Sequence, residues 1–265
     1  MAEVYTHGYH GSVVQQHAVR SAENSASFLL PHLKAHFKLL DVGCGPGSIT
    51  RGFAKFVEKV IGVDSSEGLI QQAREAGGDV EFQVASAYKL PFEENLFDVV
   101  FAHQVLQHLA NPVKALQEMQ RVCKPGGFVA VREAVYSTMH GAPQLPQLQR
   151  WRELYMSTAR LNGGEPDAGL HLKSWMQTAG FQSVHFTSSA VSYSSEDEAA
   201  RQAWGESWAE RTLHSFGPRA KELQLASQSE LEEIVSAWKQ WASDSSGVFV
   251  YVNGEAIAYK AASGK

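Results

Sequence analysis

A short apolar stretch that runs into alternating glycines is the most informative part of this sequence. Residues 38–42 read Lys-Leu-Leu-Asp-Val, and in residues 43–47 every second position is glycine. Glycine permits a sharp turn and lets the backbone approach a ligand where a β-carbon would collide with it. A second apolar stretch, residues 60–63, leads into Asp64, whose carboxylate can accept hydrogen bonds from both hydroxyls of a ribose. The two features together predict a site for an adenosine-containing cofactor.

The glycine spacing narrows the choice of cofactor. A dinucleotide site requires another glycine where Ser48 stands, and a phosphate-binding loop requires a lysine that this loop lacks. The remaining pattern resembles the first motif of the class I S-adenosylmethionine (SAM) methyltransferases, with Asp41 opening the loop. The alternative is a structural turn that holds no ligand. The resemblance assigns cofactor binding to Tyr5, Arg20, Asp41, Gly43, Cys44, Gly45, Gly47, Asp64, Ser65, Ser86, Ala87 and His103.

Methyl transfer from a sulfonium is an in-line displacement, so alignment of the acceptor with the methyl group supplies much of the catalysis. A general base helps a hydroxyl acceptor, and His103, just beyond a predicted strand over 97–102, is the best candidate for it. The alternative is that His103 shapes the pocket or contacts the cofactor through its backbone. His140, in a predicted loop, is a second candidate pocket histidine, and His108 is assigned a structural role.

Aromatic and cationic residues supply candidates for the rest of the pocket. We expect Arg20 to bind the cofactor carboxylate, with Tyr5 or Tyr9 folding over the sulfonium; the alternative for Arg20 is a surface ion pair with Glu23. Cys44 is interpreted as a small loop residue rather than a reactive thiol. An aromatic acceptor pocket is predicted from four side chains whose spacing also fits core packing: Trp151, Tyr155, Trp204 and Trp208.

Composition limits the classes of function. The chain has 265 residues and a formal net charge of −5, without a basic run that would predict nucleic-acid binding. No apolar stretch approaches the roughly 18 residues of a membrane span, and the polar N-terminus does not resemble a signal peptide. Two cysteines predict no disulfide framework, and His7, His10 and His17 are too loosely spaced for a metal site. These features predict a cytoplasmic protein without nucleic-acid or membrane partners and leave its oligomeric state open, and the resemblance implies a small-molecule substrate.

The elements that must position these residues alternate between strand and helix. Strands are predicted over 38–42, 60–64, 80–85, 97–102 and 128–132, with helices over 48–57, from Ser65 or Ser66 to Gly77, around Leu106 and Leu109, and from Asn111 to Gly126. This order predicts a doubly wound, mostly parallel α/β sheet. Helices follow over 143–161, 170–179 and 195–244, with strands over 181–193 and, as a strand or a hairpin around Asn253-Gly254, over 247–260.

We expect a single methyltransferase domain over 1–265 with three parts: an N-terminal helical lid (1–37), a SAM-binding core (38–135), and a completion of the sheet with a helical insertion for the substrate pocket (136–265). The lead-in over 12–37 is predicted to be an amphipathic helix that Pro31 interrupts.

Further motifs extend the resemblance over almost the whole chain. The sequence is similar to the ubiquinone/menaquinone-biosynthesis-type branch of class I methyltransferases, whose fold implies a seven-stranded sheet. The matching stretches are residues 5–10, 20–24, 89–92, 124–127, 132–133 and 162–169. One departure is Ser86, which stands where the branch has an aspartate that accepts from the adenine amine. A hydroxyl can still accept this hydrogen bond, although less strongly than a charged group.

The resemblance includes fungal enzymes that S-methylate reduced epidithiodiketopiperazines such as gliotoxin, so S-methylation of a thiol or dithiol natural product is the expected reaction. O-, N- or C-methylation of an aromatic or quinone-like metabolite is one alternative. A SAM-binding protein without catalysis, or with a regulatory role, is another.

Overall fold

The computed structural model describes residues 20–262, and within them seven strands form one mixed sheet in the order β3-β2-β1-β4-β5-β7-β6. The bounds of the strands are β1 Lys38–Val42, β2 Lys59–Asp64, β3 Glu81–Val84, β4 Phe97–His103, β5 Cys123–Ala142, β6 Ser183–Tyr193 and β7 Val248–Tyr259. Neighbours from β3 to β5 pair in parallel, whereas β7 pairs antiparallel with both β5 and β6. The prediction of a mostly parallel doubly wound sheet is confirmed.

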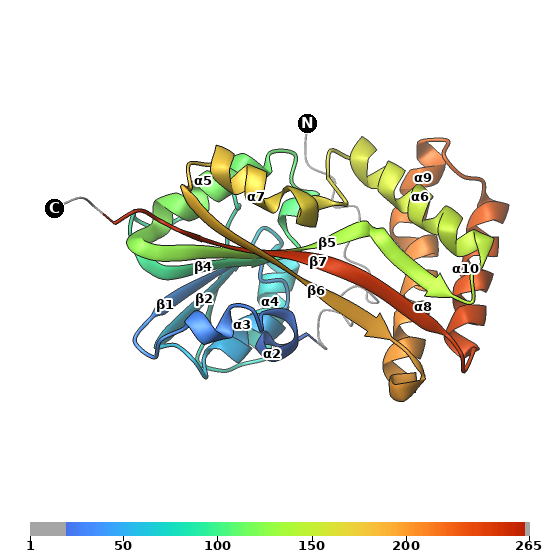
Figure 1. The fold of residues 1–265 in the computed structure, drawn as a ribbon, viewed down its shortest axis with the longest axis horizontal. Coiled ribbons are helices and arrows are strands. Elements are labelled where there is room, and N and C mark those ends of the chain that lie inside the picture. The colour runs from blue at the N-terminus through green and yellow to red at the C-terminus, as the bar shows by residue number, and fades with distance from the viewer. Residues whose placement is uncertain (1–19, 263–265) are drawn as a thin grey trace.

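Helices cover the sheet and form a second layer at one end of it (Figure 1). The α-helices are α2 Ala22–Ser25, α3 Ser48–Phe53, α4 Glu67–Glu75, α5 Pro112–Val122, α6 Pro146–Leu161, α7 Ala168–Thr178, α8 Glu198–His214, α9 Phe216–Glu222 and α10 Gln228–Ser243, and the 3₁₀-helices are η1 Leu30–His32, η2 Leu106–His108 and η3 Ser195–Asp197. In Figure 1, α5 and α7 lie on one side of the sheet and α2 and α3 on the other. The predicted helical insertion before the last strand is α8 to α10.

Alternate residues of the parallel strands point to opposite faces, and each face has its own core. Leu40 and Val42 pack in the core that includes α5 and α7, whereas Leu39 packs with Phe53 of α3 on the other face. Because both faces are buried, the strands carry continuous apolar runs instead of an alternating pattern. These runs are what made the strands recognisable in the sequence.

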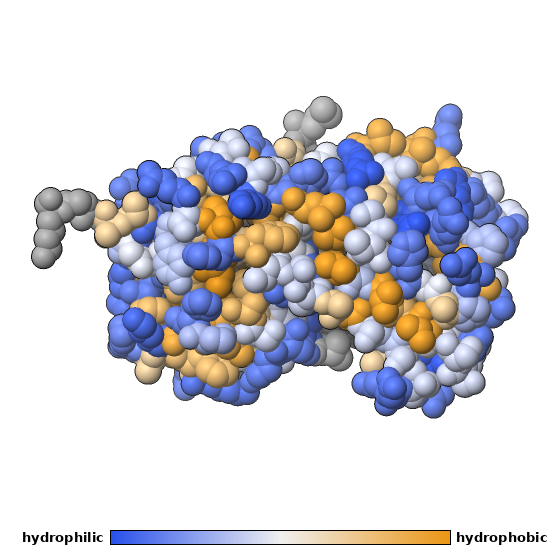
Figure 2. Space-filling model, in the orientation of Figure 1, coloured by the Kyte–Doolittle hydropathy of each residue, from blue (hydrophilic) through white to orange (hydrophobic). Residues whose placement is uncertain are grey.

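A third core holds the helical insertion on the extensions of β5 and β7. Five of the six tryptophans lie in it. The ring of Trp151 packs edge-on against Trp208 at 4.5 Å and against Trp238 at 4.8 Å between centroids. Figure 2 shows apolar side chains interspersed with polar ones on the face of the molecule that carries β6 and β7.

β5 is much longer than the predicted strand over 128–132. Its pairing with β7 begins at Phe128 opposite Tyr259 and continues to Ala142 opposite Val248, so the strand leaves the main sheet and enters the insertion. His140 therefore lies in a strand and not in a loop, and Cys123 begins this strand instead of belonging to a helix. The sequence prediction was wrong here because the regular alternation of strands and helices stops after residue 135, and this change was interpreted as the end of the strand.

Of the two alternatives for residues 247–260, a strand or a hairpin, the strand is confirmed, since β7 runs through Asn253-Gly254 without a turn. Two other expectations were wrong. The helix predicted over 48–57 ends at Phe53. Within residues 20–37 the expected lead-in consists only of the short helices α2 and η1, and the part of it over residues 12–19 lies outside the described residues.

No helix among residues 20–262 combines the length and the apolar character that crossing a bilayer requires.

Packing explains why a glycine that also fits a hairpin turn lies inside strand β7. A β-carbon at Gly254 would overlap the carbonyl oxygen of Gly169 on α7, so glycine here serves close packing of a helix on a strand. We expect Gly254→Ala to lower the free energy of unfolding by about 1–3 kcal/mol through overpacking.

Gly68→Ala is the matched control, because the space around this exposed position of α4 is open and alanine favours the helix by up to about 1 kcal/mol. Urea denaturation of both variants measures the difference. Equal stability of the two variants would contradict the packing role of Gly254.

Candidate functional site

The glycine loop is held against the end of β2 by its own backbone. The N–H groups of Gly43 and Cys44 both donate to the Val63 carbonyl oxygen, at 2.7 and 3.0 Å. Gly43 has a φ of +73° and Gly47 a φ of +77°, a region that side chains with a β-carbon rarely adopt. A β-carbon at Gly43 would also overlap Val105. These glycines are thus required by the loop itself.

Asp64 ties the loop to the following helix. One carboxylate oxygen accepts from Gly45 N at 3.0 Å, and the other accepts from Ser66 N at 2.9 Å. Ser66 in turn caps α4, as predicted. Burial raises the pKa of Asp64, although these backbone hydrogen bonds oppose the rise. Each oxygen retains a lone pair, so Asp64 can still accept hydrogen bonds from a ligand.

Asp41 lies deeper, at the end of β1. It accepts a hydrogen bond from Thr50 Oγ1 at 2.7 Å, and burial raises its pKa to about 7. Burial also raises the pKa of the neighbouring Cys44 thiol, as do the charges of Asp41 and Asp64. A thiol with a raised pKa is a poor nucleophile, so the interpretation of Cys44 as an inert loop residue fits its environment.

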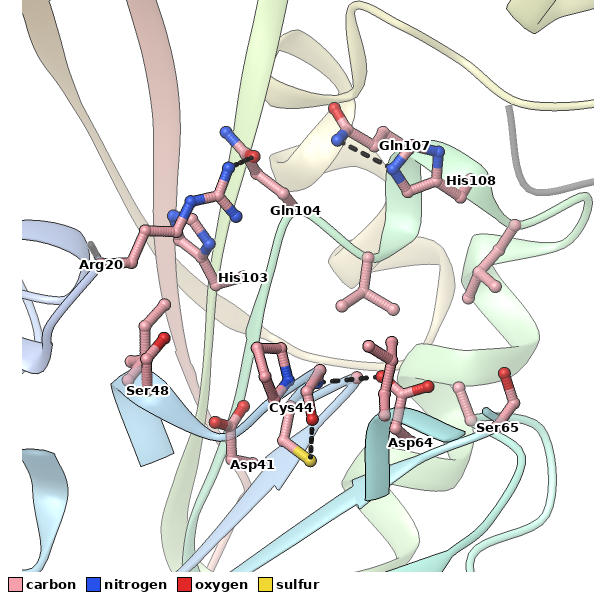
Figure 3. Close-up of a pocket in the computed structure, with 18 of the residues that line it drawn as sticks. Arg20, Asp41, Cys44, Ser48, Asp64, Ser65, His103, Gln104, Gln107 and His108 are labelled. Carbon is pink, nitrogen blue, oxygen red and sulfur yellow. Dashed lines mark hydrogen bonds between the residues drawn. The ribbon is translucent and has the colours of Figure 1, made fainter. Parts of the chain in front are cut away.

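One cavity brings most of the predicted site residues together, above the carboxyl ends of β1, β2 and β4 (Figure 3). The predicted residues that line it are Arg20, Asp41, Gly43, Cys44, Gly45, Asp64, Ser65, Ser86, Ala87 and His103. Gly47 does not line the cavity, and Tyr5, with Tyr9, His7, His10 and His17, lies outside the described residues.

At the edge of the cavity, Ser86 and Ala87 belong to the loop after β3. Ser86 Oγ accepts from Tyr88 N at 3.2 Å, which holds the turn and leaves its O–H and its second lone pair for a ligand.

Arg20 extends over the cavity and donates to Gln104 Oε1 at 2.7 Å. Gln104 has a φ of +54°, a backbone conformation that is uncommon for residues other than glycine. Glu23 pairs instead with Lys55 at 2.9 Å, so the expected alternative of an Arg20–Glu23 ion pair is wrong.

His103, the last residue of β4, is buried and contacts Arg132 on the adjacent strand β5. Arg132 Nη1 lies 3.0 Å from His103 Nε2. Because a guanidinium can only donate, Nε2 must be the acceptor, and the proton of the neutral imidazole is on Nδ1. Arg132 is held in turn by Glu255 at 3.1 Å. This arrangement leaves His103 suited to donate a hydrogen bond and not to remove a proton.

His108 lines the cavity at the end of η2, while His140 does not line it. Burial, followed by the charges of Arg20 and Arg211, lowers the pKa of His108 to about 3. Its Nε2 lies 3.2 Å from Gln107 Nε2, and Figure 3 shows this pair across the cavity from Cys44 and Asp64. Gln107 Oε1 is buried without a hydrogen-bond partner within residues 20–262, so it offers an acceptor to a ligand.

The end of the cavity opposite the loop is aromatic. Trp204 and Trp208 of α8 line it together with Tyr136 of β5 and Tyr251 of β7. The other two predicted aromatic residues lie behind this wall. Tyr155 stacks on Tyr136 with centroids 4.5 Å apart, and Trp151 packs against Trp208.

Sequence reasoning missed several residues of the cavity because the fold brings them from distant segments: Gln104, Gln107, Tyr136, Met139, Arg211 and Tyr251. Gln104 follows the predicted β4 and could have been found by position at the sheet edge. For Tyr136, Arg211 and Tyr251 no local signal exists. Among residues 20–262, no group of histidine, cysteine and acidic residues could hold a metal ion.

Comparisons with known proteins identify a methyltransferase family. Residues 40–131 match the family described as "Methyltransferase domain". An uncharacterized methyltransferase of Schizosaccharomyces pombe is 37% identical over 97% of this chain and 96% of its own length. The ubiquinone/menaquinone biosynthesis C-methyltransferase UbiE of Neisseria meningitidis serogroup A is 34% identical over 58% of this chain and 71% of its own length.

Solved structures show the same fold at lower identity. Phosphoethanolamine N-methyltransferase 2 of Haemonchus contortus, in complex with S-adenosyl-L-methionine, superimposes with a TM-score of 0.54 at 22% identity, over 90% of this chain and 52% of that chain.

The lowered pKa of His108 predicts a loss of stability in acid. Its pKa is about 6.5 in the unfolded chain and about 3 in the folded one, so between these values only the unfolded state binds the proton. Stability from this group is complete above pH 6.5 and is lost as the pH falls toward 3. We expect His108→Gln to reduce the stability lost between pH 7.5 and pH 4.5 by up to about 2–3 kcal/mol.

Guanidinium denaturation of the wild type and the variant at both pH values measures this difference. An acid-induced loss that is the same in both proteins would show that His108 is not held neutral by its surroundings.

Proposed function

This chain belongs to the class I SAM-dependent methyltransferases, and from that premise we propose that it methylates a small, largely apolar metabolite on a thiol. The supporting observation is a single cavity with two unlike ends. One end is the glycine loop with Asp64, and the other is the aromatic wall of Trp204, Trp208 and Tyr251. Pockets of this kind take small organic molecules, because apolar walls bury the ligand and a few polar groups orient it.

Bound SAM supplies an electrophilic methyl group on a sulfonium. We assign its ribose hydroxyls to Asp64, its adenine to Ser86 and Ala87, and its carboxylate to Arg20, with Tyr5 as an additional contact. Asp41, the backbone groups of Gly43, Cys44 and Gly45, and Ser65 complete this side, while Gly47 supports the turn of the loop. The fit rests on the remaining acceptor capacity of Asp64 and Ser86 and on the guanidinium of Arg20, which lines the same cavity.

A thiol acceptor fits the acid–base groups around the cavity. A thiol has a pKa of roughly 8.5 and is partly ionised at neutral pH, so it requires less help than a hydroxyl. His103 accepts from Arg132 and is a poor base, and the low pKa of His108 makes it a weak one. The resemblance expected from the sequence motifs, to fungal enzymes that methylate thiols, is the second reason to propose sulfur. The similarity to the C-methyltransferase UbiE supports the alternative, methylation of a quinone-like metabolite on a phenol oxygen or a ring carbon. The experiment below compares this alternative with thiol methylation.

The decisive experiment incubates the purified chain with methyl-labelled SAM and a matched panel of small thiols, phenols and amines. We expect label to be transferred to thiols. Transfer confined to phenols, amines or ring carbon would replace the thiol assignment with the corresponding alternative.

Cofactor binding provides a second prediction. Removal of the Asp64 carboxylate should weaken SAM binding by roughly 10- to 100-fold, the effect of losing charge-assisted hydrogen bonds to the ribose. Isothermal titration calorimetry on Asp64→Ala measures this effect. Asp79→Ala is the control, because it makes the same change at an exposed position outside the cavity. Unchanged affinity in Asp64→Ala, with the fold intact, would show that the ribose lies elsewhere.

The role of His103 provides a third prediction. With a thiol acceptor we expect His103→Gln to lower kcat by less than about tenfold, whereas an acceptor that depends on His103 as general base should lose roughly 100-fold or more. Glutamine is the chosen replacement because its amide oxygen can still accept from Arg132, which His103→Ala would leave without this partner. Steady-state rates with matched thiol and phenol substrates distinguish the two cases.

A further inference from the structure

Gln107 carries a buried hydrogen-bond acceptor in the wall of the cavity. It belongs to η2, is 3% exposed and lines the cavity. Its side-chain oxygen Oε1 has no hydrogen-bond partner within residues 20–262. A buried polar atom without a partner costs free energy, and a ligand that donates to this oxygen removes that cost.

The backbone of Gln107 is held from two sides, so the point from which its side chain extends is set before any ligand binds. Glu133 on β5 accepts from the N–H groups of residues 105–107 at distances between 2.7 and 3.3 Å. On the other side, the carbonyl oxygen of Gln107 accepts from Glu165 N at 2.9 Å. A β-carbon at Gly164 would overlap this carbonyl oxygen, so the segment before α7 packs directly on it. A group held in this way binds a ligand with little further loss of conformational entropy.

The neighbouring imidazole determines which end of the Gln107 amide remains for a ligand. His108 Nε2 lies 3.2 Å from Gln107 Nε2. An amide nitrogen can only donate, so His108 Nε2 is the acceptor of this pair. Burial lowers the pKa of His108 to about 3, which keeps the imidazole neutral and able to accept near neutral pH. The amide nitrogen of Gln107 is therefore engaged, and the amide oxygen is the group that remains.

The place of Gln107 in the cavity favours the acceptor molecule over the cofactor as its partner. Figure 3 shows Gln107 and His108 across the cavity from Cys44 and Asp64, the side at which we place SAM. The adenine, the ribose and the carboxylate of SAM have other residues as partners in the proposed arrangement. The donor to Gln107 is therefore expected on the molecule that receives the methyl group.

We propose that the acceptor carries, besides the atom that is methylated, an N–H or O–H group that donates to Gln107 Oε1, and that Gln107 selects for this group. This inference rests on the proposed function and specifies its substrate class. A site that hydrogen-bonds a substrate N–H or O–H rejects an analogue without this group, because the buried partner then remains without a hydrogen bond. Since the donor is not the atom that reacts, the bond is present in the bound substrate and in the transition state alike. Gln107 should therefore affect KM more than kcat.

Matched aromatic thiols test the inference. The three aminothiophenols and the three methylthiophenols differ only in an amino group that replaces a methyl group of similar size. An apolar wall favours the methyl compounds, so a preference for an amino compound requires a hydrogen-bond partner. In the wild type we expect kcat/KM for at least one aminothiophenol to exceed that of its methyl counterpart about tenfold or more. Gln107→Met should remove this preference, chiefly by raising KM, and Gln107→Glu, which keeps an acceptor oxygen, should retain it.

Asn253→Leu is the matched control. Asn253 is also a buried amide whose side chain has no hydrogen-bond partner in the described part of the chain, but it does not line the cavity. Thermal unfolding of each variant shows that the fold is kept, and calorimetry measures its affinity for S-adenosylhomocysteine. The inference is overturned if no wild-type pair shows a preference for the amino compound, a comparison that requires no variant. It is also overturned if Gln107→Met and Asn253→Leu change the preference alike, or if Gln107→Met weakens S-adenosylhomocysteine binding and leaves the preference unchanged.

A second series separates this inference from the proposed function. Thiol methylation without any preference for amino compounds overturns the inference alone. If thiols are not methylated, the aminophenols and the cresols are compared by their binding to the full chain saturated with S-adenosylhomocysteine. A Gln107-dependent preference for the aminophenols would uphold the inference and count against a thiol acceptor. Absence of binding in both series would overturn the inference.

Discussion

The site depends on one partly buried carboxylate that joins three elements. Asp64 sits at the end of β2, receives the N–H of Gly45 from the loop after β1, and receives the N–H of Ser66 at the start of α4. Burial disfavours the charge of this group, and two backbone donors partly compensate. This tie adds to the backbone hydrogen bonds from Gly43 and Cys44 to Val63, and it joins the loop to the start of α4 at the edge of the cavity. The group we assign to the ribose is thus also a group that holds the loop of its own pocket.

Two long strands connect the parallel sheet with the aromatic end of the cavity. β5 and β7 run from the parallel sheet into the aromatic core of the insertion, and they carry Tyr136 and Tyr251 into the cavity wall. His103 and Arg132 sit on neighbouring strands in paired positions, so the hydrogen bond that fixes the imidazole follows from sheet register. The two ends of the cavity are therefore joined by the backbone hydrogen bonds of the same sheet.

Local features of the sequence predicted which residues line the glycine-loop end of the cavity, whereas contacts between distant segments were not predictable. The loop and Asp64 were recognisable because each combines a strand end with a characteristic residue over a few positions. The state of His103 was not predictable, since it depends on Arg132 in the adjacent strand. Arg211 could not be recognised from the sequence, because its burial depends on the packing of α8 against α9 and α10. Gly254 looked like a turn residue because its reason for being glycine is Gly169, 85 positions away in the chain.

The insertion leaves the sheet at the end of β6 and returns at the start of β7, and these two points are neighbours in the sheet. Tyr193 pairs with Phe249, so the segment between them, α8 to α10, starts and finishes side by side. The pairing of β6 with β7 therefore fixes both ends of the insertion, while its helices pack on the strand extensions through the aromatic core. The hydrogen bonds that hold the glycine loop lie outside this segment. A substitution on α8 at Arg211 or at one of its two tryptophans would thus change the aromatic wall of the cavity and leave these hydrogen bonds in place.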